Sequence, residues 1–182
     1  MIKTEEHTLL EKAREFNPDA LEAVYDRYSP ALYAYAFRML GDSASAEDCV
    51  SETFSRFLKA LRQGRGPESH LQAYLYRIAH NWITDLFRRY APAMVSIEEE
   101  ALQDPDDTGE QAEGNIRRRQ MRAALRSLTP EQRQALVLRY LEGWSNEAVA
   151  RAMDRPVGAV KALQHRGIAA LRRMLVREEE EP

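Results

Sequence analysis

The stretch SLTPEQRQALVLRYLEGWSNEAVARAMDRPVGAVKALQHRGIAALRRML, residues 127–175, decides the fold. Thr129 followed by Pro130 predicts a helix start, because Thr caps free backbone N–H groups and proline fits the first helical position. Gly143 ends this helix, and Ser145 caps a short one, NEAVARAM. A three-residue turn then leads into a longer basic helix. A short helix, a tight turn and a longer helix predict a helix-turn-helix.

The longer helix has two different faces. Its apolar face holds Val160, Leu163, Gly167, Ala170, Leu171 and Met174. Its opposite face holds Lys161, Ala162, His165, Ala169 and Arg172. Small residues let the backbone approach a DNA groove, while Lys161 and His165, one turn apart, supply donors and positive charge. The alternative on this evidence alone is a solvated basic helix within a bundle.

Residues 1–90 also predict helices with short breaks. An apolar stripe with spacings of three and four runs from Leu21 to Leu40, and Pro30 is expected to interrupt it. Asp42 or Ser43 is expected to cap a helix over 46–61, AEDCVSETFSRFLKAL. The glycines and the proline of QGRGPES, residues 63–69, predict a loop, and a last helix is expected over about residues 70–89. The predicted fold class is therefore all-α.

Charge divides the chain into four parts. Residues 1–90 sum to −1, residues 91–115 contain eight acids and no base, residues 116–177 sum to +10, and residues 178–182 add −4. The total of −3 argues against nucleic acid at face value, but it is a cancellation around a strongly basic part. We predict two small helical domains, 1–90 and 116–177, joined by an acidic flexible linker at 91–115. An acidic tail follows at 178–182.

Several function classes are excluded by what the sequence lacks. The single cysteine, Cys49, leaves no intramolecular disulfide and no cysteine-cluster zinc site. The four histidines have no metal-ligand spacing, and they are His7, His70, His80 and His165. No glycine-rich phosphate loop or nucleophile elbow is present, so we expect no enzyme and no cofactor. No apolar run is long enough for a bilayer and no signal peptide is evident, so we expect a cytoplasmic protein with no membrane partner.

Both parts together resemble bacterial RNA polymerase sigma factors of the extracytoplasmic-function group. The resemblance covers about residues 17–89 and 120–175, through AEDCVSETFSRFLKAL, YLYRIAHNWITDLFRR and the helix-turn-helix stretch. Two motif blocks in the family's order make it specific. It implies a promoter-specificity subunit that binds core RNA polymerase and performs no bond chemistry. The first domain would bind polymerase and open the minus-ten element, and the second would read the minus-thirty-five element.

Residue by residue, the resemblance implies three contact sets. Asp48, Ser51 and Glu52 match positions that engage the clamp helices of the large polymerase subunit, whose flap is a further expected contact. Ser51 departs from the usual Gln. The minus-ten set is Tyr74, Arg77, His80, Asn81, Arg88 and Arg89. The loop at 63–69 corresponds to a segment that helps hold a flipped base of the melted strand.

The minus-thirty-five set is expected to be Arg155, Lys161, Gln164, His165 and Arg166. In this set Arg155 and Arg166 would hold phosphates. Ala162 and Leu163 replace the family's usual Ser–Arg pair, and Gln164 takes a usually apolar place. We expect Leu163 to supply the core contact and Gln164 to lie at the groove border.

A second function class remains open from the sequence. A stand-alone helix-turn-helix activator or repressor would bind duplex DNA as a dimer and use residues 1–90 for sensing. Residues 46–89 weigh against it, because they match polymerase docking and lack the features of a ligand pocket. An anti-sigma factor is a further candidate partner under the first interpretation.

Overall fold

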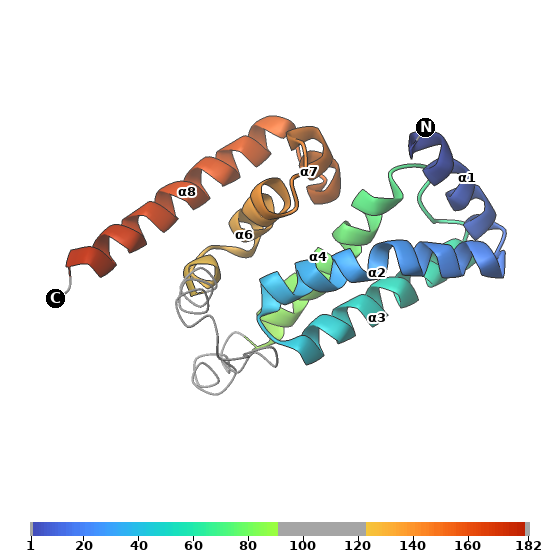
Figure 1. Cartoon of the computed structure of the whole chain (residues 1–182), viewed down its shortest axis with the longest axis horizontal. Coiled ribbons are helices and arrows are strands. Elements are labelled where there is room, and N and C mark those ends of the chain that lie inside the picture. Colours follow the sequence, from blue (N-terminus) through green and yellow to red (C-terminus); the bar gives the residue numbers. More distant parts are fainter. Residues whose placement is uncertain (1, 91–122, 181–182) are drawn as a thin grey trace, which may run out of the picture.

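The computed structural model describes residues 2–90 and 123–180, and both parts are helical (Figure 1). The first domain contains α1 (Ile2–Arg14), α2 (Pro18–Leu40), α3 (Ser43–Arg62) and α4 (Leu71–Tyr90). The second domain opens with a helical turn at residues 123–126. It continues with α6 (Pro130–Leu136), the π-helical η1 (Val137–Leu141), α7 (Asn146–Met153) and α8 (Val157–Glu180).

Side-chain caps fix where the first-domain helices begin. The Asn17 side chain accepts a 3.0 Å hydrogen bond from the backbone N–H of Ala20, and Asp42 accepts one of 2.7 Å from Ser45. Between α2 and α3, Gly41 adopts a φ of 89°, which lets its N–H bond the Phe37 carbonyl at 2.8 Å. The predicted cap at Asp42 is confirmed.

The predicted interruption at Pro30 is wrong, because α2 runs through it. Proline inside a helix costs about 3 kcal/mol through a lost hydrogen bond and a steric clash. Val24 and Tyr28 on one side of Pro30 and Leu32 and Tyr35 on the other are all buried. One continuous apolar face therefore packs on the domain core on both sides of the proline, and its burial outweighs the local cost.

The second domain follows the boundaries expected from its caps. Thr129 and Gln132 form a reciprocal capping box at the start of α6, and the Ser145 hydroxyl accepts from the N–H of Ala148 at 3.2 Å. The turn between α7 and α8 occupies the three expected residues, with Asp154 left-handed at a φ of 52°. The helix-turn-helix is thus formed by α7 and α8.

The predicted linker at 91–115 lies outside the described residues. The predicted tail at 178–182 is described only to Glu180, where its backbone continues α8. Within residues 2–90 and 123–180, no helix is long and apolar enough to cross a membrane.

The two domains pack on each other in this structure. Helices α2, α3 and α4 bury a common core, and α7 lies against α4 (Figure 1). The core is continuous from Leu10 in α1 to Val160 in α8. Helix α7 therefore meets the helix that carries six of the expected DNA contacts.

Candidate functional site

The exposed face of α3 carries the residues expected to bind polymerase. Asp48 and Ser51 are exposed, whereas Glu52 is half-buried and forms a 2.7 Å ion pair with Arg56 one turn later. The structure therefore brings all three side chains to one helix face. Of the two carboxylates, that of Asp48 is the more accessible, since Arg56 competes for that of Glu52.

Next to this face lies an apolar groove between α2 and α3. Ser51 is on its edge, and its apolar lining is Tyr25, Pro30, Tyr33, Val50, Phe54 and Leu58. Tyr25 is 49% exposed and its ring centroid lies 4.8 Å from that of Phe54. An acidic edge beside an exposed aromatic groove is suited to a partner helix with basic and apolar side chains.

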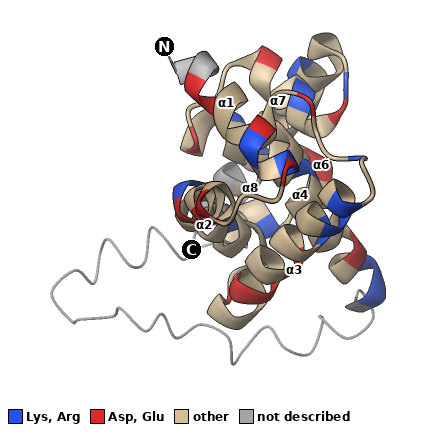
Figure 2. Ribbon diagram, turned by 90° about the vertical axis from the view of Figure 1, so that its right-hand side faces the viewer, with Lys and Arg blue, Asp and Glu red and all other residues tan. Residues whose placement is uncertain are grey.

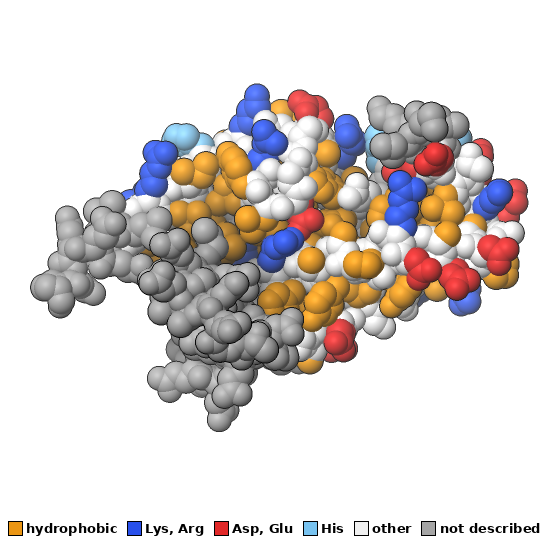
Figure 3. Space-filling model, in the orientation of Figure 1, with side chains coloured by type: hydrophobic (Ala, Val, Ile, Leu, Met, Phe, Trp, Pro, Cys, Tyr) orange, Lys and Arg blue, Asp and Glu red, His pale blue; other side chains and the backbone are white. Residues whose placement is uncertain are grey.

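Large apolar side chains are exposed in the second domain as well. Tyr140 is 58% and Leu141 is 46% exposed at the end of η1. Figure 3 shows apolar side chains reaching the surface at several places on one face of the molecule. Exposed aromatic and aliphatic side chains of this kind mark contact surfaces for other macromolecules.

Helix α4 presents its expected DNA contacts unequally. Asn81 is exposed in the middle of the helix, and Arg88 and Arg89 are exposed near its C-terminal end. Arg77 is half-buried, with its guanidinium 5.5 Å from the ring centre of Tyr74 and 3.7 Å from the Asp154 carboxylate. Since Asp154 belongs to the turn between α7 and α8, the second domain occupies part of the expected DNA surface.

His80 is buried, with only 8% of its surface exposed. Its Nδ1 lies 3.1 Å from the Tyr35 hydroxyl and its Nε2 lies 3.2 Å from the Thr84 hydroxyl. The pKa of His80 is lowered to about 4, chiefly by burial. The charge of Glu131 opposes this shift, and the charges of Arg155 and Arg133 add to it. In this arrangement His80 is a neutral buried residue and not an exposed DNA contact.

Helix α8 exposes four of the five expected duplex contacts. These are Arg155 just before the helix and Lys161, His165 and Arg166 on it. The prediction for Leu163 is confirmed, since it is buried. The prediction that Gln164 lies at the groove border is wrong, because its side chain is only 6% exposed. Gln164 follows Val160 by four residues and therefore shares its core-facing side.

The contacts that hold the two domains together come from residues that the sequence did not single out. Arg38 of α2 pairs with Glu142, and the rings of Tyr76 and Trp144 have centroids 4.7 Å apart. Arg133 donates to the Met39 carbonyl at 2.7 Å. The burial of Arg133 could have been predicted from its spacing. It lies three residues before Leu136 and four before Val137, on the buried side of the helix.

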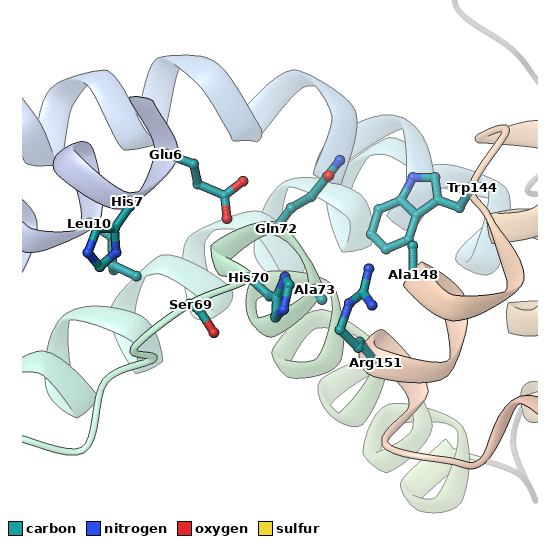
Figure 4. Close-up of a pocket in the computed structure, with 10 residues that line it drawn as sticks. All are labelled: Glu6, His7, Leu10, Ser69, His70, Gln72, Ala73, Trp144, Ala148 and Arg151. Carbon is teal, nitrogen blue, oxygen red and sulfur yellow. The ribbon is translucent and has the colours of Figure 1, made fainter. Parts of the chain in front are cut away.

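A pocket of about 390 Å³ lies where the domains meet. In Figure 4, Trp144 and Arg151 of the second domain face Gln72 and His70 of the first. Ser69, the last residue of the loop expected to help hold a flipped base, also lines the pocket. The domain contact thus reaches the edge of this loop.

Charged side chains are spread over the described helices. Figure 2 shows acidic and basic positions interspersed over the described helices. Among residues 2–90 and 123–180, no group of three or more His, Cys, Asp or Glu side chains could hold a metal ion.

Comparison with known proteins places both domains in families. Residues 24–92 match Sigma-70 region 2, and residues 118–171 match Sigma-70, region 4. The chain is 32% identical over 172 residues to the RNA polymerase sigma factor CarQ of Myxococcus xanthus, covering 91% of this chain and 95% of CarQ. It is 31% identical over 173 residues to the ECF RNA polymerase sigma factor SigX of Bacillus subtilis, covering 88% and 87%.

A third relative is longer. The ECF RNA polymerase sigma factor BldN of Streptomyces coelicolor is 33% identical over 173 residues, which span 92% of this chain but 64% of BldN. The chain therefore covers less than two thirds of that relative's length.

Two solved structures share the fold. CnrH, in complex with the cytosolic domain of CnrY, superposes with a TM-score of 0.70 at 22% identity, covering 94% of this chain and 97% of CnrH. RpoE of Bartonella quintana, in complex with the anti-sigma factor NepR, gives 0.63 at 23% identity, covering 85% and 95%.

Proposed function

The chain belongs to the extracytoplasmic-function (ECF) RNA polymerase sigma factors, non-catalytic subunits that direct promoter recognition, and we propose a division of this work among three of its surfaces. The α3 face binds core polymerase, α4 binds the melted minus-ten strand, and α8 reads the minus-thirty-five duplex. The observation that carries the proposal is the order of the two families along the chain, together with exposed residues in each of the three expected contact sets. Binding to polymerase places the protein in the cytoplasm.

Polymerase docking is assigned to Asp48, Ser51 and Glu52 with the adjoining groove. Exposed carboxylates attract a basic helix, and Tyr25 and Phe54 offer it apolar contact area. The clamp helices of the large subunit are the proposed occupant. Tyr140 and Leu141 are the proposed contact for the polymerase flap, because they are the most exposed large apolar residues in the described part of the second domain.

DNA contact is divided between single-strand and duplex surfaces. Arg77, Arg88, Arg89 and the Tyr74 ring give α4 the cationic and aromatic groups that hold an unstacked strand. On α8, Lys161 and His165 lie on one exposed face with Arg166 beside them. This face combines base-edge donors with a phosphate contact, as major-groove recognition requires.

Promoter binding by both domains requires the interface between them to open. Asp154 of the second domain pairs with Arg77 of α4. A DNA strand cannot bind the Arg77 guanidinium in place of Asp154 while α7 lies on α4. We propose that the described arrangement is a closed form and that polymerase and DNA replace the contacts between the domains.

An anti-sigma factor is the proposed partner of the closed form. CnrH binds the cytosolic domain of CnrY, and the Bartonella protein binds the anti-sigma factor NepR. Both share the fold of this chain, which supports a partner of the same class.

Run-off transcription with purified core RNA polymerase and a promoter library tests the proposal. We expect specific transcripts that depend on the added chain. A gel shift with and without core polymerase distinguishes the alternative, because a stand-alone regulator would bind a specific duplex tightly without polymerase. Specific duplex binding that core polymerase does not enhance, together with no transcript from any template, would reject the sigma function for this chain.

A further inference from the structure

Gln164 is a buried amide on the helix that is assigned to DNA. The neighbouring Lys161 and His165 are exposed, whereas Gln164 is 6% exposed and shares its side of α8 with Val160 and Gly167. Its Nε2 donates a 3.0 Å hydrogen bond to Oδ1 of Asn146. Asn146 is the first residue of α7, so the bond joins the two helices of the helix-turn-helix.

An amide at this position has a cost that an apolar side chain would not have. Burying an amide without a partner is unfavourable, and one hydrogen bond offsets only part of its lost hydration. Apolar packing is non-directional, whereas a hydrogen bond weakens steeply as its distance and angle depart from the optimum. The bond to Asn146 therefore restricts how α8 can shift or rotate against α7.

The location of the bond connects this restriction to DNA binding. In a helix-turn-helix the second helix enters the major groove and the first crosses the DNA backbone. Gln164 lies in the second turn of α8, between the two exposed side chains assigned to base edges. Asn146 lies at the start of the other helix. The bond thus joins the base-reading part of α8 directly to α7.

We propose that Gln164 is a positioning residue for duplex recognition. Its bond to Asn146 holds α8 at one depth and angle, so that Lys161 and His165 meet base edges in a fixed geometry. The role rests on the proposed function of α8 as the duplex reader. Phosphate contacts carry no sequence information, whereas base contacts need close alignment. Loss of the bond therefore lowers sequence discrimination more than total affinity.

The experiment uses the full chain bound to core RNA polymerase. A random duplex library first identifies the upstream sequence that the wild-type complex enriches. Affinities for that sequence and for a scrambled duplex are then compared for the wild type and Gln164→Met, which keeps an unbranched side chain of similar length but cannot form the bond. In Gln164→Met we expect the ratio of the affinity for the enriched duplex to that for the scrambled duplex to fall about tenfold, which corresponds to about 1.4 kcal/mol. Thermal stability and polymerase affinity should be unchanged.

Asn146 supplies the matched controls. Asn146→Ala removes the acceptor at a half-buried residue and should lower the ratio equally, so it carries the test even if Gln164→Met unfolds. Asn146→Asp keeps an acceptor oxygen and should keep the ratio, because its added charge repels both duplexes alike. The double variant Gln164→Met with Asn146→Ala should be no worse than either single variant.

A wild-type ratio in Gln164→Met and Asn146→Ala, or additive losses in the double variant, would overturn the positioning role. Lys161→Ala separates this failure from a wider one. If Lys161→Ala lowers the ratio and the Gln164 and Asn146 variants do not, only the positioning role is rejected. If the wild type enriches no sequence, or Lys161→Ala has no effect, the assignment of α8 as the duplex reader is rejected as well.

Discussion

The guanidinium of Arg133 donates a 2.7 Å hydrogen bond to the carbonyl of Met39, which lies 94 residues earlier in the chain and in the other domain. Two further bonds of 2.7 Å reach the carbonyls of Leu125 and Arg126. Arg133 is only 4% exposed, and burial lowers its pKa to about 10. A buried cation with all three nitrogens bonded thus joins the end of α2 to the second domain.

Arg133→Met should destabilise the protein markedly, because it leaves three carbonyls without their donor. We expect a loss on the order of 2–4 kcal/mol in the free energy of unfolding, as for other broken buried networks. Urea denaturation measures it. Arg173→Met on the exposed surface of α8 is the matched control and should change stability by less than about 0.5 kcal/mol. Similar losses in the two variants would contradict the role given to Arg133.

Charge reversal at Glu142 should open the domain contact. Glu142 faces Arg38 across the interface and its side chain is 13% exposed, so Glu142→Arg places two cations together in a poorly hydrated site. Trp144 then leaves the Tyr76 ring and gains exposure. A red shift of the Trp144 fluorescence emission measures the opening, in a Trp82→Phe background that removes the other tryptophan. Small-angle scattering should show a larger radius of gyration.

The second half of this test is a rescue. Arg38→Glu combined with Glu142→Arg restores opposite charges and should return the emission and the radius of gyration towards the wild type. If the double variant is as open as the single one, the ion pair is not what holds the domains closed.

Acidification should destabilise the folded chain through His80. Its folded pKa of about 4 lies below the usual 6.5, so the unfolded chain binds a proton more readily. The stabilisation is present above pH 6.5 and is lost as the pH falls from 6.5 towards 4. At 1.36 kcal/mol per pKa unit, the full effect is on the order of 3 kcal/mol. The charges of Glu131, Arg133 and Arg155 also act on His80 from the second domain.

Denaturant titrations between pH 7 and pH 4 measure this dependence. His80→Leu has no group to titrate there and should flatten the profile, apart from the contribution of carboxylates that both proteins share. An unchanged slope in His80→Leu would show that other groups cause the acid sensitivity.

Local signals predicted much of this fold, because they act over a few residues. Thr129, Ser145 and Asp42 cap helices as expected, and the turn before Val157 has the expected length. The family resemblance is confirmed by the matches to Sigma-70 regions 2 and 4. Pro30 was misread because burial on both sides of it, a tertiary effect, outweighs its local cost.

The domain contact was not predicted from the sequence, because it joins residues far apart in the chain. Nothing local distinguishes Glu142 or Trp144 from a surface residue, and the second-domain charges that act on His80 are at least 51 residues away in the chain. Gln164 is different, since its spacing of four residues from Val160 already favoured the core. Its polar side chain instead favoured a position at the DNA groove. The bond to Asn146 explains how the amide is accommodated in the core.

Asp48→Arg combined with Glu52→Arg should abolish binding to core polymerase while leaving the fold intact by circular dichroism. Both positions are at least partly exposed on α3, and reversal repels the basic helix proposed to dock there. Glu11→Arg with Glu15→Arg is a matched control, since both residues are exposed and lie before the Sigma-70 region 2 match. This control variant should bind polymerase as the wild type does. An equal loss of binding in the control would show that net charge, and not the α3 face, causes the effect.

Lys161→Ala should weaken binding to the upstream element without affecting core polymerase. Lys161 is exposed on the face of α8 assigned to bases, where loss of one good contact costs about 1–3 kcal/mol of discrimination. Arg166→Ala, at a proposed phosphate contact, should instead weaken enriched and scrambled duplexes alike and reduce the salt slope by about one. Fluorescence anisotropy of both duplexes over a salt series separates the two behaviours. If Lys161→Ala lowers both affinities equally, Lys161 contacts phosphate, and the base-reading role must pass to His165 or to another exposed residue of α8.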